Sequence, residues 1–141
     1  MRELERKIID FSYEHKLSHI GSCLTALPIT EEIYSIKKPE EKFVLSAGHS
    51  HLAHAVVMSQ QTGRPIEDFM KAGIHCDRDN GCDVSTGSLG QGIIISAGIA
   101  IANRVRRVYT LCSDGETFEG SFWEAIRLKE DMNLDNWIIY V

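Results

Sequence analysis

The sequence predicts an α/β fold in which a parallel sheet is covered by helices on both faces. Three short segments, residues 43–45, 108–111 and 137–141, are continuously apolar rather than alternating. Strands of this kind are buried on both faces, as in parallel sheets. Segments with helical character lie between them, so that strands and helices alternate along the chain. We therefore expect a three-layer α/β/α architecture.

The N-terminal part is predicted to be mainly helical. Apolar residues recur at helical spacing over residues 2–16, with charged residues between them. The polar, glycine-containing segment 17–23 indicates a break, and Pro28 suits the first turn of a second helix over residues 28–36. A charged turn over residues 37–41 leads into the first strand.

A helix is expected after the first strand. Gly48 and His49 lead into this helix, which should end near Gly63, and residues 65–70 indicate a further short helix. Residues 73–88, which are rich in Gly, Asp and Cys, are expected to form a long loop.

The C-terminal half is predicted to contain two helices and two strands. Residues 89–103 are small and β-branched apolar residues, so we expect a deeply buried helix. The strand 108–111, a turn over residues 113–120, a helix over residues 121–132 and the strand 137–141 complete the chain.

Length and charge limit the possible functions. The chain has 141 residues, which corresponds to one domain spanning residues 1–141. It carries 15 Lys and Arg against 20 Asp and Glu, a formal net charge of −5. This mild acidity argues against nucleic acid or an anionic membrane surface as the main partner.

Cysteine usage and hydropathy favour a cytoplasmic location. The four cysteines form no CxxC pair, and we expect reduced thiols. The charged N-terminus lacks the apolar run of a signal peptide. The longest apolar stretch, residues 92–102, is interrupted by Ser96 and Gly98 and is shorter than the ~20 residues of a membrane span.

Polar residues follow the first two strands where a ligand would be expected. In parallel sheets ligands bind at the carboxyl ends of the strands. Ser46 to His49 follow the first strand, and Ser113 to Glu116 follow the second. Asp114 could take Mg²⁺ or Ca²⁺ together with diphosphate oxygens. The alternative is a simple Asp-Gly turn, with Glu119 serving only as an acid in the first turn of the next helix.

A glycine-rich segment, residues 86–92 (TGSLGQG), precedes the apolar helix. Glycines allow backbone to approach a ligand closely, and a helix N-terminus suits a phosphate. The same glycines could instead serve tight helix packing alone. The spacing matches neither the Walker A motif nor the dinucleotide fingerprint.

Three histidines lie together at residues 49, 51 and 54. His51 and His54 are three residues apart, which would allow a zinc site. No Cys or carboxylate lies in register on that helix, so we expect none. His49, at the turn from strand to helix, is better placed to donate a hydrogen bond to a phosphate.

Four motifs in one order are more specific than any single motif. They are His19-Ile20-Gly21, Phe43 to His49 (FVLSAGH), Ser85 to Gly92 (STGSLGQG), and Asp114-Gly115-Glu116 followed by Glu119-Gly120 and Trp123-Glu124-Ala125. This order resembles the N-terminal, diphosphate-binding domain of transketolases and transketolase-like subunits. The resemblance covers nearly the whole chain, from about residue 5 onward.

The resemblance implies a thiamine diphosphate cofactor held through Mg²⁺ or Ca²⁺ and the transfer of a two-carbon ketol unit between sugars. By motif, the substrate-facing catalytic residues would be His19 and His75. The metal ligand would be Asp114, and the cofactor-binding residues would be His49, Gly87, Leu89, Gly115 and Glu119. Glu119 resembles a glutamate at the family's subunit interface.

Two parts of the family's site are expected outside these 141 residues. The second metal ligand, an asparagine, would lie near position 144, which makes the fold incomplete at its C-terminus. Asn133 and Asn136 precede the last strand and would lie at its wrong end. The pyrimidine-binding domain, which activates the cofactor in the family, would come from a second subunit.

The main hypothesis is therefore a transketolase-like subunit that transfers a ketol unit only with a partner. The alternatives are a non-catalytic truncated or miniature protein, and a fragment of a longer protein. Because the last strand would expose a sheet edge, we also expect a homo-oligomer, a dimer or larger.

Overall fold

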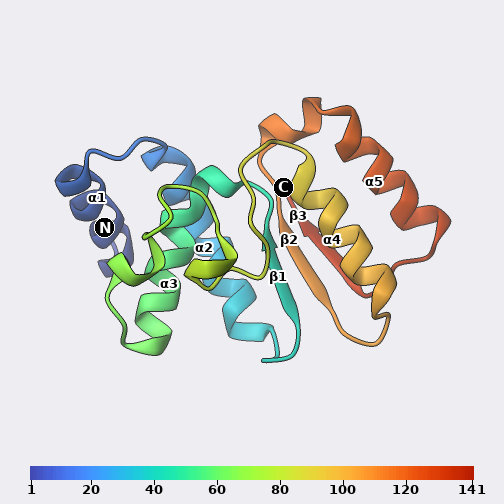
Figure 1. Cartoon of the computed structure of the whole chain (residues 1–141), viewed down its shortest axis with the longest axis horizontal. Helices are drawn as coiled ribbons and strands as arrows, with labels where there is room; N and C mark the ends of the chain where they lie inside the picture. Colours follow the sequence, from blue (N-terminus) through green and yellow to red (C-terminus); the bar gives the residue numbers. More distant parts are fainter.

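The computed structural model describes residues 1–141 and confirms the three-layer α/β/α fold (Figure 1). The central sheet contains β1 (Lys42–Leu45), β2 (Val108–Leu111) and β3 (Trp137–Tyr140), all parallel and in the order β1-β2-β3. The core residues of β1 and β2 are buried. The sheet is parallel, as expected. In β3, which lies at the edge of the sheet, only Trp137 is buried and the other three residues are half-buried.

Helices cover both faces of the sheet. One face carries α1 (Glu3–His15), α2 (Ile20–Ile36) and α3 (His51–Thr62), and the other carries α4 (Gln91–Ala102) and α5 (Gly120–Asp131) (Figure 1). Each side has its own hydrophobic core, one of 18 and one of 10 buried residues, so the sheet separates two packed layers. Four 3₁₀ turns link these elements: η1 (Gly48–Ser50), η2 (Ile66–Phe69), η3 (Arg78–Asn80) and η4 (Asp114–Phe118).

The second helix differs from its prediction. It begins at Ile20 rather than at Pro28, and the break is confined to the few residues around Lys16 and His19, both of which have positive φ. Pro28 lies within the helix and faces solvent. Because a proline has no N–H, the backbone carbonyl four residues earlier receives no helical hydrogen bond. This carbonyl lies on the solvent side of the helix, where water can donate to it. Burial of the opposite face, including Leu27 and Ile33, outweighs the proline's cost.

The helix α4 was expected to be deeply buried, and this is only half correct. Gly92, Ile93 and Ala97 are buried against the sheet, whereas Ile94 and Ile95 are 40% and 41% exposed. The sequence is apolar all round, but one side of the helix has no covering element in this chain.

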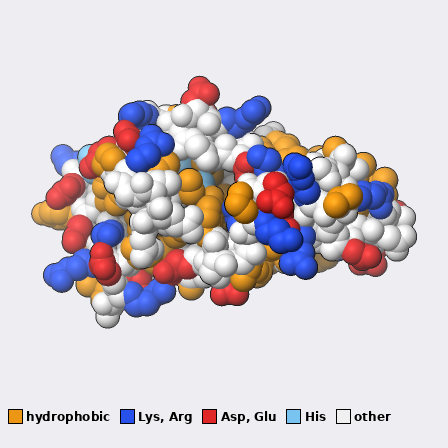
Figure 2. Space-filling view, turned by 90° about the horizontal axis from the view of Figure 1, so that it is seen from below, with side chains coloured by type: hydrophobic (Ala, Val, Ile, Leu, Met, Phe, Trp, Pro, Cys, Tyr) orange, Lys and Arg blue, Asp and Glu red, His pale blue; other side chains and the backbone are white.

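The molecular surface shown in Figure 2 carries interspersed basic and acidic side chains. In addition, every helix of the structure is too short or too polar to cross a membrane.

Candidate functional site

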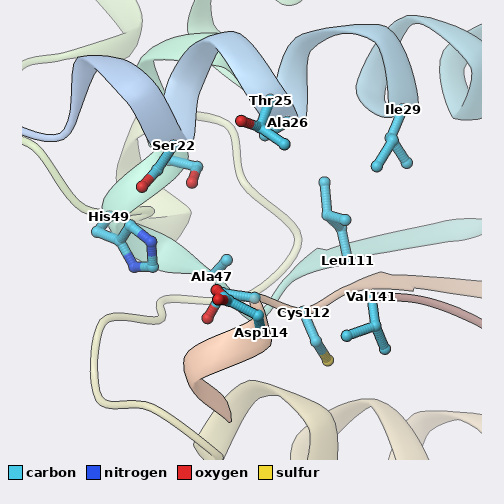
Figure 3. A pocket seen from close by; sticks show the side chains of 12 residues that line it. Ser22, Thr25, Ala26, Ile29, Ala47, His49, Leu111, Cys112, Asp114 and Val141 are labelled. Carbon is cyan, nitrogen blue, oxygen red and sulfur yellow. The ribbon is translucent and has the colours of Figure 1, made fainter. Parts of the chain in front are cut away.

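A cavity of about 420 Å³ opens at the carboxyl ends of the strands, between them and α2 (Figure 3). Its wall on α2 is formed by Ser22, Thr25, Ala26 and Ile29. The opposite wall contains residues that follow the strands: Ala47, His49 and Ser50 after β1, Leu111 to Asp114 at the end of β2, and Val141 after β3. The cavity thus lies at the edge of the sheet where ligands of parallel α/β proteins bind.

The turn after β1 presents His49 to the cavity. Ala47 N–H donates to the carbonyl of Leu111 at 3.1 Å, which holds the turn against the end of β2. Gly48 packs so closely on the loop containing Thr86 that a Cβ would lie 2.6 Å from the Thr86 carbonyl oxygen. Only glycine fits there, and this close packing fixes the start of the turn that carries His49.

The ring of His49 is half-buried and lies beside that of His19, with ring centroids 5.1 Å apart. Burial lowers the pKa of His49, and the neighbouring His19 lowers it further. His49 is therefore a neutral imidazole at neutral pH, able to donate one hydrogen bond and to gain a proton when an anion binds. His19 reaches this position because it takes a left-handed conformation immediately before α2.

The turn after β2 presents an exposed carboxylate, Asp114, at the cavity. Next to it, a Cβ on Gly115 would make only ordinary contacts, with the Leu89 side chain and with Ser113 Oγ, each at 3.8 Å. Asp114 and Gly115 are thus close to Leu89.

Glu116 joins the strand ends from beneath the site. It is fully buried, and its Oε1 accepts hydrogen bonds from the hydroxyl of Ser46 and from Gly90 N–H (3.0 Å). Its Oε2 accepts from Ser113 N–H at 2.9 Å. One carboxylate therefore connects β1, β2 and the start of α4. The sequence motif around Glu116 predicted no role for it, because nothing in the local pattern shows that this side chain points inward.

Two of the three glycines in the glycine-rich segment, Gly90 and Gly92, are required by close packing. A Cβ on Gly92 would lie 2.6 Å from Ser46 Cα, and one on Gly90, whose φ is +76°, would clash with Ser121 Oγ. At Gly87 the nearest group is the ring of His75 at 3.2 Å. Gly87 and His75 line a second hollow of about 330 Å³. Of the three, Gly87 is the glycine left facing a ligand-sized space.

The predicted site residues thus form three groups. His19, His49 and Asp114 lie at or beside the main cavity, with Gly115 and Leu89 adjacent. His75 and Gly87 lie at the second hollow. Glu119 is exposed, lies at the start of α5 beside Gly90, and lines neither hollow.

Asn136 lies at the opposite end of the sheet, as expected from its position before β3. Its amide donates to three backbone carbonyls, those of Ala100, Asn103 and Arg106, at 3.0–3.1 Å. This side chain is committed to the fold and is remote from the strand ends.

The donor set of the cavity fits a polyanion with a divalent cation. A neutral imidazole (His49) and the side-chain hydroxyls of Ser22 and Ser50 line the cavity and can donate to phosphate oxygens. Asp114 is the single carboxylate there, so a cation such as Mg²⁺ would take its remaining ligands from phosphate and water.

Comparison with known proteins points to one family. A sequence profile described as "Transketolase, thiamine diphosphate binding domain" matches residues 9–141. Transketolase-like protein 2 of Mus musculus is 39% identical over 113 residues, covering 70% of this chain and 18% of the mouse protein.

Two bacterial transketolase subunits match over more of the chain. The 6-deoxy-6-sulfo-D-fructose transketolase subunit SqwG of Clostridium sp. (strain MSTE9) is 31% identical over 147 residues, covering 88% of this chain and 54% of that protein. An apulose-4-phosphate transketolase subunit of Phocaeicola vulgatus is 28% identical over 158 residues, covering 96% and 56%. The chain thus spans about half the length of these two relatives. Because the profile matches residues 9–141, the chain belongs to the transketolase family and corresponds to part of its thiamine diphosphate-binding domain.

Proposed function

We propose that this chain is the diphosphate-binding part of a transketolase-like transferase that moves a two-carbon ketol unit between sugars or sugar phosphates. The observation that carries this proposal is the convergence of His49 and Asp114 on one cavity at the strand ends, with His19 beside His49. Thiamine diphosphate, when bound, would supply the electron sink for cleaving and forming the carbon–carbon bond.

The chain's own residues would bind and orient. His49 would donate to a diphosphate oxygen, and Asp114 would hold Mg²⁺ against the same phosphates. Gly87, Gly115 and Leu89 would lie along the cofactor, with Glu119 close to the subunit interface. His19 and His75 would face the sugar, where an imidazole can hold a hydroxyl in place or move its proton.

Two observations support the need for a second subunit. The cavity has one carboxylate, that of Asp114, which we assign to the metal. The acid that would activate a pyrimidine ring would therefore come from another subunit. In addition, Leu89, Ile94, Ile95 and Trp123 are 38–56% exposed, and Phe118 is 90% exposed, on α4, α5 and the turns before them. Large apolar side chains gathered on neighbouring elements mark an interaction surface. A partner with the pyrimidine-binding domain, or a second copy of this chain, would cover them.

The alternative proposal is a non-catalytic, self-associating protein. It is favoured by the same exposed apolar surface and by the single carboxylate, because one carboxylate makes a weak Mg²⁺ site.

Calorimetric titration separates the two proposals. Thiamine diphosphate with Mg²⁺ is titrated into the chain alone and into the chain mixed with the product of the neighbouring gene. Saturable binding, strengthened by that partner, is expected for a transferase subunit. Absence of binding in both samples contradicts it and leaves the non-catalytic alternative.

A pair of variants tests the metal assignment. Asp114→Ala should abolish the Mg²⁺-dependent part of binding, since the carboxylate at the cavity is lost. Asp131→Ala, at the far end of α5, serves as the matched control and should bind like the unchanged chain. Equal binding by both variants contradicts the role of Asp114.

A further inference from the structure

Four metal-ligating side chains lie together in the core, away from the strand-end cavity. They are His51 and His54 on α3 and Cys76 and Cys82 from the loop before α4. One ligand atom from each lies within 4.8 Å of the other three. His51 is fully buried, and the other three are 3–8% exposed. We call these four residues the Cys/His cluster.

Three S–N distances in the Cys/His cluster match the edges of a tetrahedral zinc site. Zn–S bonds of about 2.3 Å and Zn–N bonds of about 2.0–2.1 Å place the S and N ligands of a tetrahedron about 3.5–3.6 Å apart. Cys76 Sγ is 3.4 Å from His51 Nδ1. Cys82 Sγ is 3.6 Å from His51 Nδ1 and 3.5 Å from His54 Nδ1.

The second nitrogen of each histidine is fixed by a hydrogen bond. His51 Nε2 is 2.7 Å from the carbonyl oxygen of Phe69, which can only accept, so Nε2 carries the proton and Nδ1 has a free lone pair facing the thiols. His54 Nε2 is 2.6 Å from the Tyr34 hydroxyl. Metal-ligating histidines characteristically bond through their second nitrogen to such an outer group, which sets the tautomer and ring orientation.

Charge balance also suits an ion at this depth. Two thiolates and two neutral imidazoles neutralise one divalent cation, so burial would leave no net charge in the core.

We propose that His51, His54, Cys76 and Cys82 bind one structural Zn²⁺ ion through two imidazole nitrogens and two thiolates. All four positions of a tetrahedron are filled by protein, so the site is closed and has no place for substrate. This proposal is independent of the proposed function, since none of the four residues faces the strand-end cavity.

The ion would fasten the long loop to α3. The loop is otherwise attached mainly along β1, where Asp83 accepts from Phe43 N–H (2.9 Å) and Thr86 Oγ1 donates to the Leu45 carbonyl (2.6 Å). Cys76 directly follows His75, so the same ion would also fix the position of that exposed histidine at the second hollow.

Elemental analysis of the purified chain tests the proposal. The chain is expressed with added zinc and purified without a metal-affinity step. One zinc per chain is expected after dialysis. Removal by a strong chelator under reducing conditions should lower Tm by more than about 5 °C, and added zinc should restore it, because a ligand bound only to the folded state stabilises it.

A matched pair of cysteine variants identifies the ligands. Cys82→Ser should lose at least nine-tenths of the bound zinc, whereas Cys23→Ala, an equally buried cysteine outside the Cys/His cluster, should keep it. Where Cys82→Ser fails to fold, Co²⁺ substitution in the unchanged chain replaces this test. Thiolate-to-cobalt charge-transfer absorption with intense tetrahedral visible bands is then expected.

Three results would overturn the proposal. The first is a chain that contains no zinc and whose Tm is unaffected by chelator or added zinc. The second is a Co²⁺ spectrum without thiolate charge transfer. The third is an intact mass, after purification under reducing conditions, that shows a Cys76–Cys82 disulfide in place of bound metal.

Discussion

The strand-end cavity and the Cys/His cluster lie on the same chain but differ in burial and in completeness. The cavity is open, its carboxylate Asp114 is exposed, and its remaining metal ligands are expected from phosphate and water. The Cys/His cluster is buried and provides four ligand atoms from one chain. A catalytic site must admit substrate and a partner, whereas a structural site gains from excluding both. The open cavity with an incomplete set of metal ligands therefore suits catalysis, whereas the buried cluster with four ligands suits stabilisation of the fold.

The largest expected effect concerns Glu116, the one fully buried carboxylate beneath the cavity. Glu116→Ala leaves the Ser46 hydroxyl and two backbone N–H groups without their acceptor, so the free energy of unfolding should fall by about 3–5 kcal/mol. Denaturant unfolding measures this. The exposed Glu130→Ala on α5 is the control and should change stability by less than about 0.5 kcal/mol. A loss below 1 kcal/mol at Glu116, on the order of one ordinary hydrogen bond, would show that the strand ends do not depend on it.

The next effect concerns the glycines of α4. Gly92→Ala should cost about 1–3 kcal/mol by overpacking, since its Cβ would meet Ser46. Gly98 lies in the same helix with nothing within 4 Å, and Gly98→Ala should stabilise by about 0.5–1 kcal/mol through helix propensity. Thermal or denaturant unfolding of the two variants gives the comparison. Equal effects would contradict the packing role of Gly92 at the edge of the strand-end site.

The variant Tyr34→Phe tests whether the Tyr34 hydroxyl positions His54 for zinc binding. Losing the hydroxyl that orients His54 should weaken zinc binding about 10–100-fold, as loss of outer partners generally does. Competition with a chromophoric chelator measures the affinity. Tyr13→Phe removes a hydroxyl from a residue that is 85% exposed and should leave the affinity unchanged. Indistinguishable affinities would mean that Tyr34 does not position a ligand.

The smallest expected effect is a pH dependence of diphosphate binding. Burial lowers the pKa of His49 in the free protein, and a bound anion should raise it. Binding then takes up a proton. Affinity is therefore highest below the free pKa, falls as pH rises between the free and bound values, and levels off above the bound value. Calorimetry across this range should show the slope for the unchanged chain and lose the His49 contribution in His49→Gln. If affinity depended on pH equally in the unchanged chain and in His49→Gln, the proton would be taken up by the ligand and not by His49.

The strands and the strand-end residues could be predicted from the sequence because both depend on local patterns. Continuous apolar runs indicated β1, β2 and β3. The polar residues in the turns after β1 and β2, His49 and Asp114, had to lie at one edge of a parallel sheet. Residues that follow neighbouring parallel strands lie close together because all these strands end at the same edge of the sheet.

The Cys/His cluster could not be predicted in this way. A zinc site at His51 and His54 was not expected because no cysteine lies in register on their helix, and Cys76 and Cys82 were regarded only as reduced thiols. The two pairs meet because a loop more than twenty residues later folds back on α3, and this long-range contact leaves no periodicity. The paired spacings His-x₂-His and Cys-x₅-Cys were the available signal.

The start of α2 and the exposure of α4 were missed for a related reason. Both depend on which neighbours cover a helix. Pro28 is tolerated because its side of α2 faces water, and Ile94 and Ile95 are exposed because no element of this chain covers them.

Histidine NMR tests the central claim, that the strand-end site and the Cys/His cluster are separate sites with separate ligands. The six histidines include reporters for each site: His19 and His49 at the strand ends, and His51 and His54 in the Cys/His cluster. His75 lies at the second hollow, and His15, which is stacked on Phe11, serves as a reference. The zinc-loaded chain, mixed with its partner subunit, is titrated with thiamine diphosphate and Mg²⁺. The imidazole signals of His49 and His19 should shift most, while those of His51, His54 and His15 stay in place. Shifts centred on His51 and His54, or no shift at His49 at saturating cofactor, would contradict the account.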